Sequence, residues 1–108
     1  MASANIDQFL AELERSFAPE RARGTRAILQ YHFTGDVTGA CYAVIADGVL
    51  HAAPGEHTAP GATIQTDFAL WQRILAHEVD RLMVYQEGQY TIQGDVELAL
   101  DSDAWFTH

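Results

Sequence analysis

Histidine, cysteine and carboxylate side chains are the groups in this chain that could perform bond chemistry, and their spacing decides which chemistry is open to them. His77-Glu78 begins like the HExxH pattern of zinc proteases, in which two histidines one helical turn apart bind the metal. The fifth position of the pattern is Arg81, so the second histidine is missing. This stretch therefore does not predict a metal site.

The remaining reactive residues do not form a recognisable set either. His51, Glu56 and His57 lie at a strand end and in a loop, without the spacing of metal ligands. Cys41 and His32 could meet across neighbouring strands as thiol and base, but a small buried cysteine is the simpler interpretation. Phosphate loops, nucleophile elbows and paired-carboxylate signatures are absent from the sequence. We expect no catalytic set, no metal and no cofactor.

The charge balance excludes several classes of partner. Fifteen Asp and Glu residues face six arginines and no lysine, for a net charge of −9. Nucleic-acid affinity and docking on anionic membranes both depend on cationic side chains, so neither is expected. Without lysine, Schiff-base chemistry and a Walker-type phosphate loop are also excluded.

Length and composition predict one soluble domain over residues 1–108. The chain has 108 residues, close to the commonest domain size, and 48% of them are hydrophobic. Its single cysteine cannot form an internal disulfide, which favours the cytoplasm. The N-terminus lacks the basic and apolar regions of a signal peptide, and no stretch approaches the roughly 18 apolar residues of a membrane span. Stable membrane insertion is not expected.

Apolar periodicity organises the first half of the chain. Apolar residues at helical spacing predict an amphipathic helix over residues 5–17, with Asn5 as its N-cap. Alternating residues predict strands over 26–34, 40–46 and 49–53. Asp47-Gly48 favours a two-residue hairpin turn, because both positions of that turn need a positive φ. These strands form an antiparallel meander.

The second half reads as a crossover followed by helices and two more strands. Residues 54–61 form a Pro- and Gly-rich loop, and residues 62–65 a short strand. Thr66 or Asp67 caps a helix that begins at Phe68. The later elements are a short helix capped by Asp80, a strand over 89–93, and a last helix capped by Asp95.

Bulky apolar residues are more abundant in this second half than three short helices need for packing. They include Phe68, Trp71, Leu75, Leu82, Met83, Tyr85, Trp105 and Phe106. Most of them must form the core that covers one face of the sheet. Their excess also suggests a cavity or a homodimer interface.

Three segments resemble one known family. They are the Asp47-Gly48 hairpin, the ATIQTD segment at 62–67 that leads into a helix, and GQYTIQGDVELAL at 88–100. Their order and spacing resemble the sterol carrier protein domain, the lipid-binding module of the non-specific lipid-transfer family. The likeness covers roughly residues 5–106.

The resemblance implies an α+β fold in which helices cover one face of a five-stranded mixed β-sheet. It also implies a tunnel between sheet and helices that takes a sterol, a fatty acyl chain or an acyl-coenzyme A. Trp105 and Phe106 would line this tunnel or plug it. The residues that the resemblance places at the tunnel are Phe68, Trp71, Leu75, Leu82, Met83, Tyr85, Tyr90, Ile92, Leu98, Leu100, Trp105 and Phe106.

Two kinds of function follow, and the sequence favours the first. The protein carries or presents a hydrophobic small molecule as a monomer or homodimer, without catalysis. Alternatively it is a small cavity enzyme or biosynthetic accessory, with His32, Cys41, Tyr42, Tyr90 or Asp95 as polar participants. The alternative requires ionisable groups that converge in the cavity with shifted pKa values.

Overall fold

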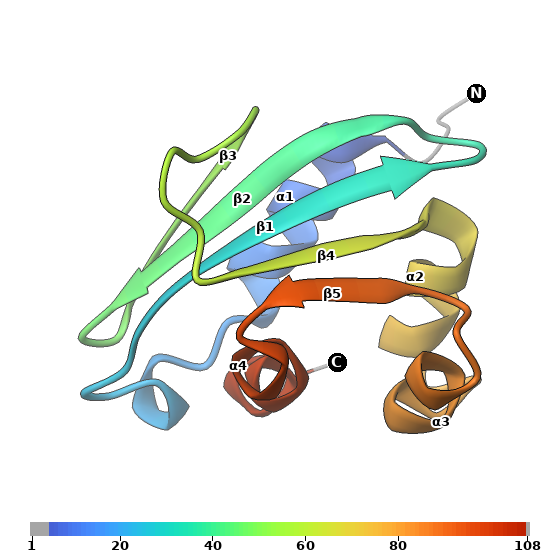
Figure 1. The fold of residues 1–108 in the computed structure, drawn as a ribbon. Helices are drawn as coiled ribbons and strands as arrows, with labels where there is room; N and C mark the ends of the chain where they lie inside the picture. Colours follow the sequence, from blue (N-terminus) through green and yellow to red (C-terminus); the bar gives the residue numbers. More distant parts are fainter. Residues whose placement is uncertain (1–4, 108) are drawn as a thin grey trace.

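The computed structural model describes residues 5–107, which form four α-helices, two short 3-10 helices and a five-stranded sheet (Figure 1). The helices are α1 (Ile6–Ser16), η1 (Pro19–Arg21), α2 (Phe68–Leu75), α3 (Arg81–Gln86), α4 (Val96–Asp101) and η2 (Ser102–Trp105). The strands are β1 (Arg26–Thr34), β2 (Gly39–Ala46), β3 (Val49–Pro54), β4 (Ala62–Asp67) and β5 (Thr91–Gly94).

The sheet is mixed, with the order β3-β2-β1-β4-β5. β1 and β4 run parallel, with Tyr31 opposite Ile64, and the other neighbouring pairs run antiparallel. The first three strands are the predicted meander. The chain crosses from β3, at one edge of the sheet, to β4 on the far side of β1, and the parallel β1–β4 pair makes the sheet mixed. The predicted fold class is confirmed.

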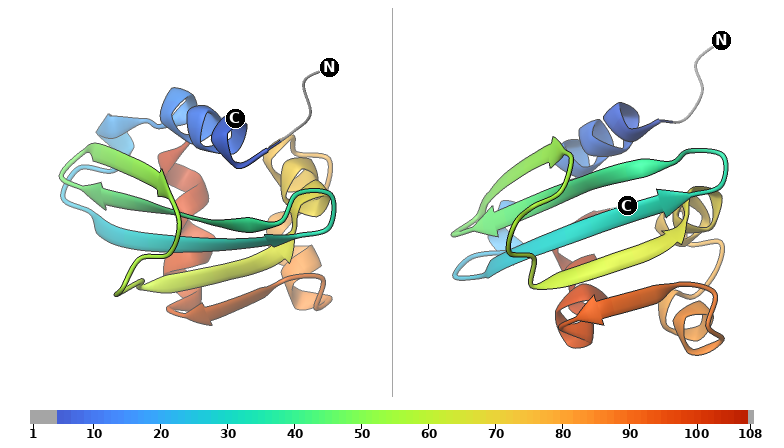
Figure 2. Two further views of the ribbon diagram at one scale, coloured as in Figure 1. Left: turned by 90° about the horizontal axis from the view of Figure 1, so that it is seen from above. Right: turned by 45° about the horizontal axis from the view of Figure 1, so that its top comes forward.

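One face of the sheet is buried under helices. In Figure 2 (left), α1 and α2 lie on one side of the sheet and the β3–β4 connection on the other. Alternate strand residues point to the helices because side chains alternate along a strand. These buried residues are Ala27, Leu29, Tyr31 and Phe33 of β1, Cys41, Ala43 and Ile45 of β2, and Ala62, Ile64 and Thr66 of β4.

Local sequence signals set the ends of most elements. The side chains of Asn5, Asp67, Asp80 and Asp95 each accept a hydrogen bond from the backbone N–H three residues later, at 2.8–3.1 Å. Each of these contacts satisfies a donor that the first helical turn leaves unpaired. In the β2–β3 turn, Asp47 and Gly48 both have positive φ, 51° and 80°. The predicted caps and the predicted hairpin turn are confirmed.

The structure corrects several predictions, among them two strand ends: β2 begins at Gly39 rather than at residue 40, and β3 ends at Pro54 rather than at residue 53. β5 begins at Thr91 rather than at Gln89, because the Gln89 N–H donates to the Val84 carbonyl (3.0 Å) and closes α3. β4 continues to Asp67, because parallel pairing with β1 extends that far. The segment predicted as a linker over 18–25 contains η1.

The β3–β4 connection packs against the face of the sheet opposite the helices. Gln30 on β1 holds it there: Nε2 donates to the carbonyls of Cys41 (2.9 Å) and Gly55 (3.0 Å), and Oε1 accepts from the His57 N–H (2.8 Å). The connection covers Gln30, which is only 2% exposed. It therefore crosses the sheet in a defined position.

The C-terminal segment pairs with the residues at the end of α1. Phe17 and Phe106 form an antiparallel bridge, and their rings lie 5.7 Å apart. The Ala18 N–H donates to the Trp105 carbonyl (2.8 Å), and the Thr107 N–H donates to the Ser16 carbonyl (2.7 Å). These contacts fasten the C-terminal segment to the end of α1.

Candidate ligand-binding site

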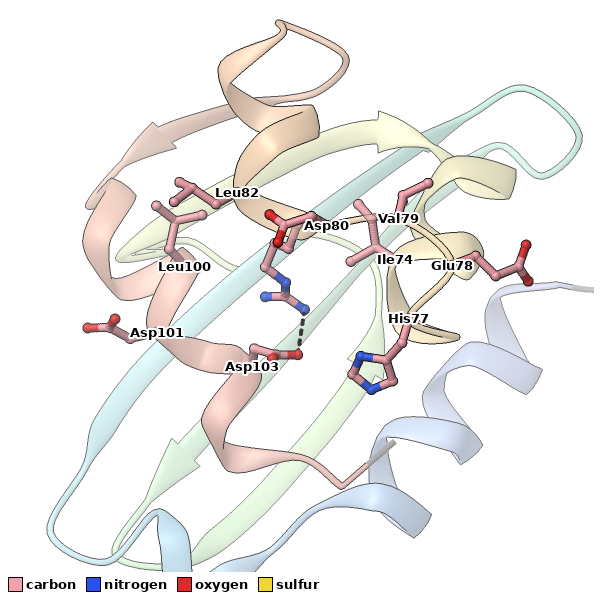
Figure 3. Close-up of a pocket in the computed structure, with 10 residues that line it drawn as sticks. Ile74, His77, Glu78, Val79, Asp80, Leu82, Leu100, Asp101 and Asp103 are labelled. Atoms are coloured by element: carbon pink, nitrogen blue, oxygen red, sulfur yellow. Dashed lines mark ion pairs between the residues drawn. The ribbon is translucent and has the colours of Figure 1, made fainter.

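A cavity of about 700 Å³ lies between the α2–α3 segment and the α4–η2 segment (Figure 3). Ile74, Val79, Leu82 and Leu100 give it an apolar part. The other lining residues are His77, Glu78, Asp80, Arg81, Asp101 and Asp103. Four carboxylates and one guanidinium therefore share the cavity with aliphatic side chains.

A tight helix end shapes one wall of this cavity. After α2, His77 adopts the left-handed conformation (φ 60°). The His77 N–H donates to the Ile74 carbonyl (3.1 Å) and the Glu78 N–H to the Arg73 carbonyl (2.9 Å), which is a Schellman motif. Glycine is the usual residue at this position. The turn separates α2 from α3 and places residues 77–80 along the cavity.

Arg81 connects the two sides of the cavity. It is the first residue of α3, and its side chain is 13% exposed. Nη1 donates to the Ala99 carbonyl (3.3 Å) and the Ser102 Oγ (3.4 Å). Nη2 forms an ion pair with Asp103 at 3.3 Å, shown dashed in Figure 3. The guanidinium is therefore held in one orientation by α4 and η2.

Aromatic rings lie between Arg81 and the sheet. The Arg81 Cζ lies 4.8 Å from the Trp71 ring centroid, and the Trp71 ring contacts Tyr31 (6.0 Å) and Tyr90 (5.6 Å). The Tyr90 hydroxyl donates to the Arg81 carbonyl (3.0 Å). Burial raises the pKa of Tyr90 to about 12, and burial also raises the pKa of Tyr31. Both phenols are therefore neutral at physiological pH and act as polar, uncharged groups.

The twelve residues predicted for the tunnel fall into several places. Leu82 and Leu100 line the cavity described above. Phe68 and Leu75 line a groove of about 540 Å³ between α1 and α2, and Leu98 lines a pocket of about 370 Å³ beside Ile28 and Val44. Trp71, Tyr90, Trp105 and Phe106 are buried in the core, Tyr85 and Ile92 are partly buried, and Met83 is 58% exposed.

Sequence reasoning missed Arg81 as part of the site and noticed it only as the residue that breaks the zinc pattern. The sequence spacing could have indicated the role of Arg81, because Arg81, Val84 and Tyr85 lie on one face of α3. Val84 is buried and Tyr85 partly buried, so this face points into the molecule. Val79 was also missed, because it lies in the turn before α3.

The polar residues named for an enzyme do not converge. β1 pairs with β2 so that Tyr31 is opposite Cys41 and His32 is opposite Ala40, which places the His32 imidazole and the Cys41 thiol on opposite faces. Cys41 is fully buried, and burial raises its pKa to about 12. Within residues 5–107, no group of three or more His, Cys, Asp and Glu side chains is placed to hold a metal ion.

None of the helices formed by residues 5–107 combines the length and the apolar character that crossing a bilayer requires.

Comparison with known proteins identifies a family. Residues 6–106 match the profile of the SCP-2 sterol transfer family. Comparison with curated protein sequences finds no significant match.

Several solved structures share the fold. Sterol carrier protein 2 like 2 from Aedes aegypti is 17% identical, with a TM-score of 0.65 over 89% of this chain and 87% of that one. The ubiquinone synthesis protein UbiJ-SCP2 is 14% identical, with a TM-score of 0.63 over 84% and 83%. The inverting sec-alkylsulfatase Pisa1 from Pseudomonas sp. is 19% identical, with a TM-score of 0.81. That alignment covers 94% of this chain but only 16% of the alkylsulfatase.

Proposed function

Because this chain belongs to the SCP-2 sterol transfer family, we propose that it binds a hydrophobic small molecule between its sheet and helices and carries or presents it. The ligand is of the sterol, fatty acid or acyl-coenzyme A type. The cavity between α2–α3 and α4–η2 is the entrance, and the aromatic residues around Trp71 form its inner boundary. The family match over nearly the whole chain is the observation that carries this proposal.

The dimensions of the cavity support the proposal. Small-molecule sites generally occupy about 300–1,000 Å³, and this cavity of about 700 Å³ falls within that range. Ile74, Val79, Leu82 and Leu100 provide apolar contacts. Each methylene group removed from water contributes about 0.8 kcal/mol, so a long chain gains affinity without a distinctive polar contact.

Binding is tested with protein purified from its own host. Native mass spectrometry of that protein will show a bound lipid, and the delipidated protein will bind a fluorescent fatty acid. Leu100→Trp narrows the cavity and will weaken binding about tenfold or more, because the larger ring takes space that the bound ligand would occupy. Repeated absence of lipid together with no binding of the probe would contradict the proposal.

A matched control separates a filled cavity from a general effect of added tryptophan. Val49 on β3 is 66% exposed and lies outside the cavity. Val49→Trp will therefore bind the probe like the unchanged chain. Equal weakening by both substitutions would place the binding site elsewhere.

A second candidate is an accessory role in biosynthesis, in which the bound molecule is presented to an enzyme. UbiJ-SCP2, which has a similar fold, is named a ubiquinone synthesis protein. A carrier and a presenter differ in what accelerates ligand release. A carrier releases its ligand to acceptor vesicles, whereas a presenter releases it faster only when its partner enzyme is added. We place either role in the cytoplasm, for a monomer or homodimer.

A further inference from the structure

Two buried hydrogen-bond donors have no acceptor; one belongs to Arg81, which lines the cavity, and the other to Trp71, whose ring lies under the Arg81 guanidinium. Within residues 5–107, the indole Nε1 of Trp71 and the Nε of Arg81 are buried side-chain atoms without a hydrogen-bond partner. Trp71 is 2% exposed. The great majority of buried polar groups in folded proteins are paired, so each exception needs a physical reason. Two exceptions in contact with each other indicate a place where an acceptor binds.

The two donors belong to one stacked pair. The Arg81 Cζ, to which Nε is bonded, lies 4.8 Å from the centroid of the Trp71 ring, which carries Nε1. Ala99, Ser102 and Asp103 occupy the terminal nitrogens of the guanidinium. Nε is thus the nitrogen of Arg81 left for a ligand, and Arg81 lines the cavity.

We propose that Trp71 and Arg81 form a polar subsite that binds an oxygen acceptor on an otherwise apolar ligand. This inference rests on the proposed function and makes it more specific. A ligand in the cavity would place its aliphatic part against residues such as Leu82 and Leu100 and its oxygen at the stacked pair. Tyr90, which contacts Trp71, does not compete for this role, because its hydroxyl already donates to the Arg81 carbonyl.

The charges around the pair select an uncharged acceptor. Figure 3 shows Asp80 and Asp103 near the middle of the cavity, and Glu78 and Asp101 at its two ends. Asp103 already compensates the charge of Arg81. A carboxylate ligand would add a negative charge to a cavity that already holds four carboxylates and one guanidinium. A ketone, ester or hydroxyl oxygen accepts the same hydrogen bonds without that repulsion. The subsite therefore favours a neutral oxygenated lipid over a free fatty acid.

Ligands that differ only in the polar group test this subsite. The probes have one saturated chain of fixed length that ends in a methyl ketone, a primary alcohol, a carboxylate or no polar group. We expect the ketone and the alcohol to bind about tenfold more tightly than the alkane, because they pair donors that otherwise stay unsatisfied. We expect the carboxylate to bind more weakly than the ketone.

Variants and spectra identify the donors. Trp71→Phe keeps an aromatic ring but removes the N–H, and it will reduce the preference for ketone over alkane to about threefold or less. The alkane affinity of the same variant controls for lost packing. Arg81→Lys removes Nε as a donor and will act in the same direction, whereas Arg23→Lys, at an exposed loop position, will leave the preference unchanged. In the unchanged chain, the ketone will shift the indole N–H resonance of Trp71, and the alkane will not.

The outcomes separate the subsite from the proposed function. Equal affinity for ketone and alkane, with no change in the Trp71 resonance, overturns the subsite and leaves lipid binding intact. Tightest binding of the carboxylate overturns the choice of a neutral acceptor. Failure of all four probes to bind contradicts the proposed function itself. If a variant does not fold, the Trp71 resonance of the unchanged chain still decides whether this donor meets the ligand.

Discussion

Gln30 is a polar residue on the sheet face that carries no helix, yet it is almost fully buried. Its amide can donate two hydrogen bonds and accept others, and it uses both capacities on backbone groups of β2 and the β3–β4 connection. A buried polar group is tolerated only when it is paired. The Gln30 side chain therefore provides hydrogen-bond partners for backbone groups that the crossover would otherwise leave unpaired.

Removing this amide will destabilise the protein. Gln30→Ala leaves the carbonyl of Gly55 and the N–H of His57 without these partners, and each such loss costs about 1–3 kcal/mol when the group stays buried. We expect the free energy of unfolding, measured in urea, to fall by about 2 kcal/mol or more. Hydrogen exchange will also become faster over residues 55–61.

Gln65 provides the matched control. It lies exposed on β4, on the same face of the sheet as Gln30. Gln65→Ala will change stability by less than about 0.5 kcal/mol, because surface substitutions rarely do more. Similar losses for both variants would show that Gln30 does not hold the crossover.

At the scale of elements, two glycines frame β5 for different physical reasons. Gly88 ends α3 in the left-handed conformation (φ 79°), and a Cβ there would meet no atom within 4 Å. Gly94 also has a positive φ (86°), but a Cβ there would lie 2.6 Å from the carbonyl oxygen of Gly61. That same oxygen accepts the Asp95 N–H at 2.9 Å. Gly94 therefore permits the close approach of two backbones at the start of α4.

Alanine substitution at these two positions will distinguish the cost of the left-handed conformation from the cost of a steric clash. Gly88→Ala brings only the conformational penalty of a left-handed residue, roughly 1–2 kcal/mol. Gly94→Ala brings that penalty and a clash with backbone, and we expect a loss of roughly 3 kcal/mol or more. Urea unfolding of both variants measures the difference. Equal losses would mean that the Gly61 segment moves aside without cost.

At the scale of the whole molecule, burial of ionisable side chains determines how stability responds to alkaline pH. Cys41 and Tyr90 have pKa values raised to about 12 from ordinary values of 9.0 and 10.0, and the pKa of Tyr31 is also raised. Burial is the largest cause for all three, because it disfavours the charged form. The chain has no lysine whose titration would overlap with theirs.

These pKa values predict alkaline destabilisation. Between pH 9 and 12 the unfolded chain loses protons that the folded chain keeps, so stability falls as pH rises, by about 1 kcal/mol per pH unit for each group in its range. The urea midpoint will stay level from pH 7 to about 8.5 and will fall above pH 9. Cys41→Ala will move the start of this fall to about pH 10. A level midpoint up to pH 11 would contradict the burial of these groups.

The sequence by itself determined the elements and the fold class. Period-two and helical patterns located the strands and helices, the hairpin turn followed from Asp47-Gly48, and the aspartate caps followed from side chains next to the residues that they bond. These are local effects, so neighbouring residues are enough to read them. The family resemblance, carried by the order of three segments, predicted the mixed sheet under one layer of helices. The profile match confirmed the family, and the strand order and pairing confirmed the sheet.

Only the tertiary structure decided which side chains meet. The contact of Arg81 with Trp71, each of which has a donor without an acceptor, joins two different helices. The hydrogen bonds of Gln30 join β1 to residues 55–57, more than twenty positions later. The β1–β2 register separated Cys41 from His32, and a histidine rather than a glycine ended α2. Such contacts depend on packing across the whole core, which no local period encodes. For the same reason, the sequence predicted apolar bulk around a cavity but not the polar pair beside it.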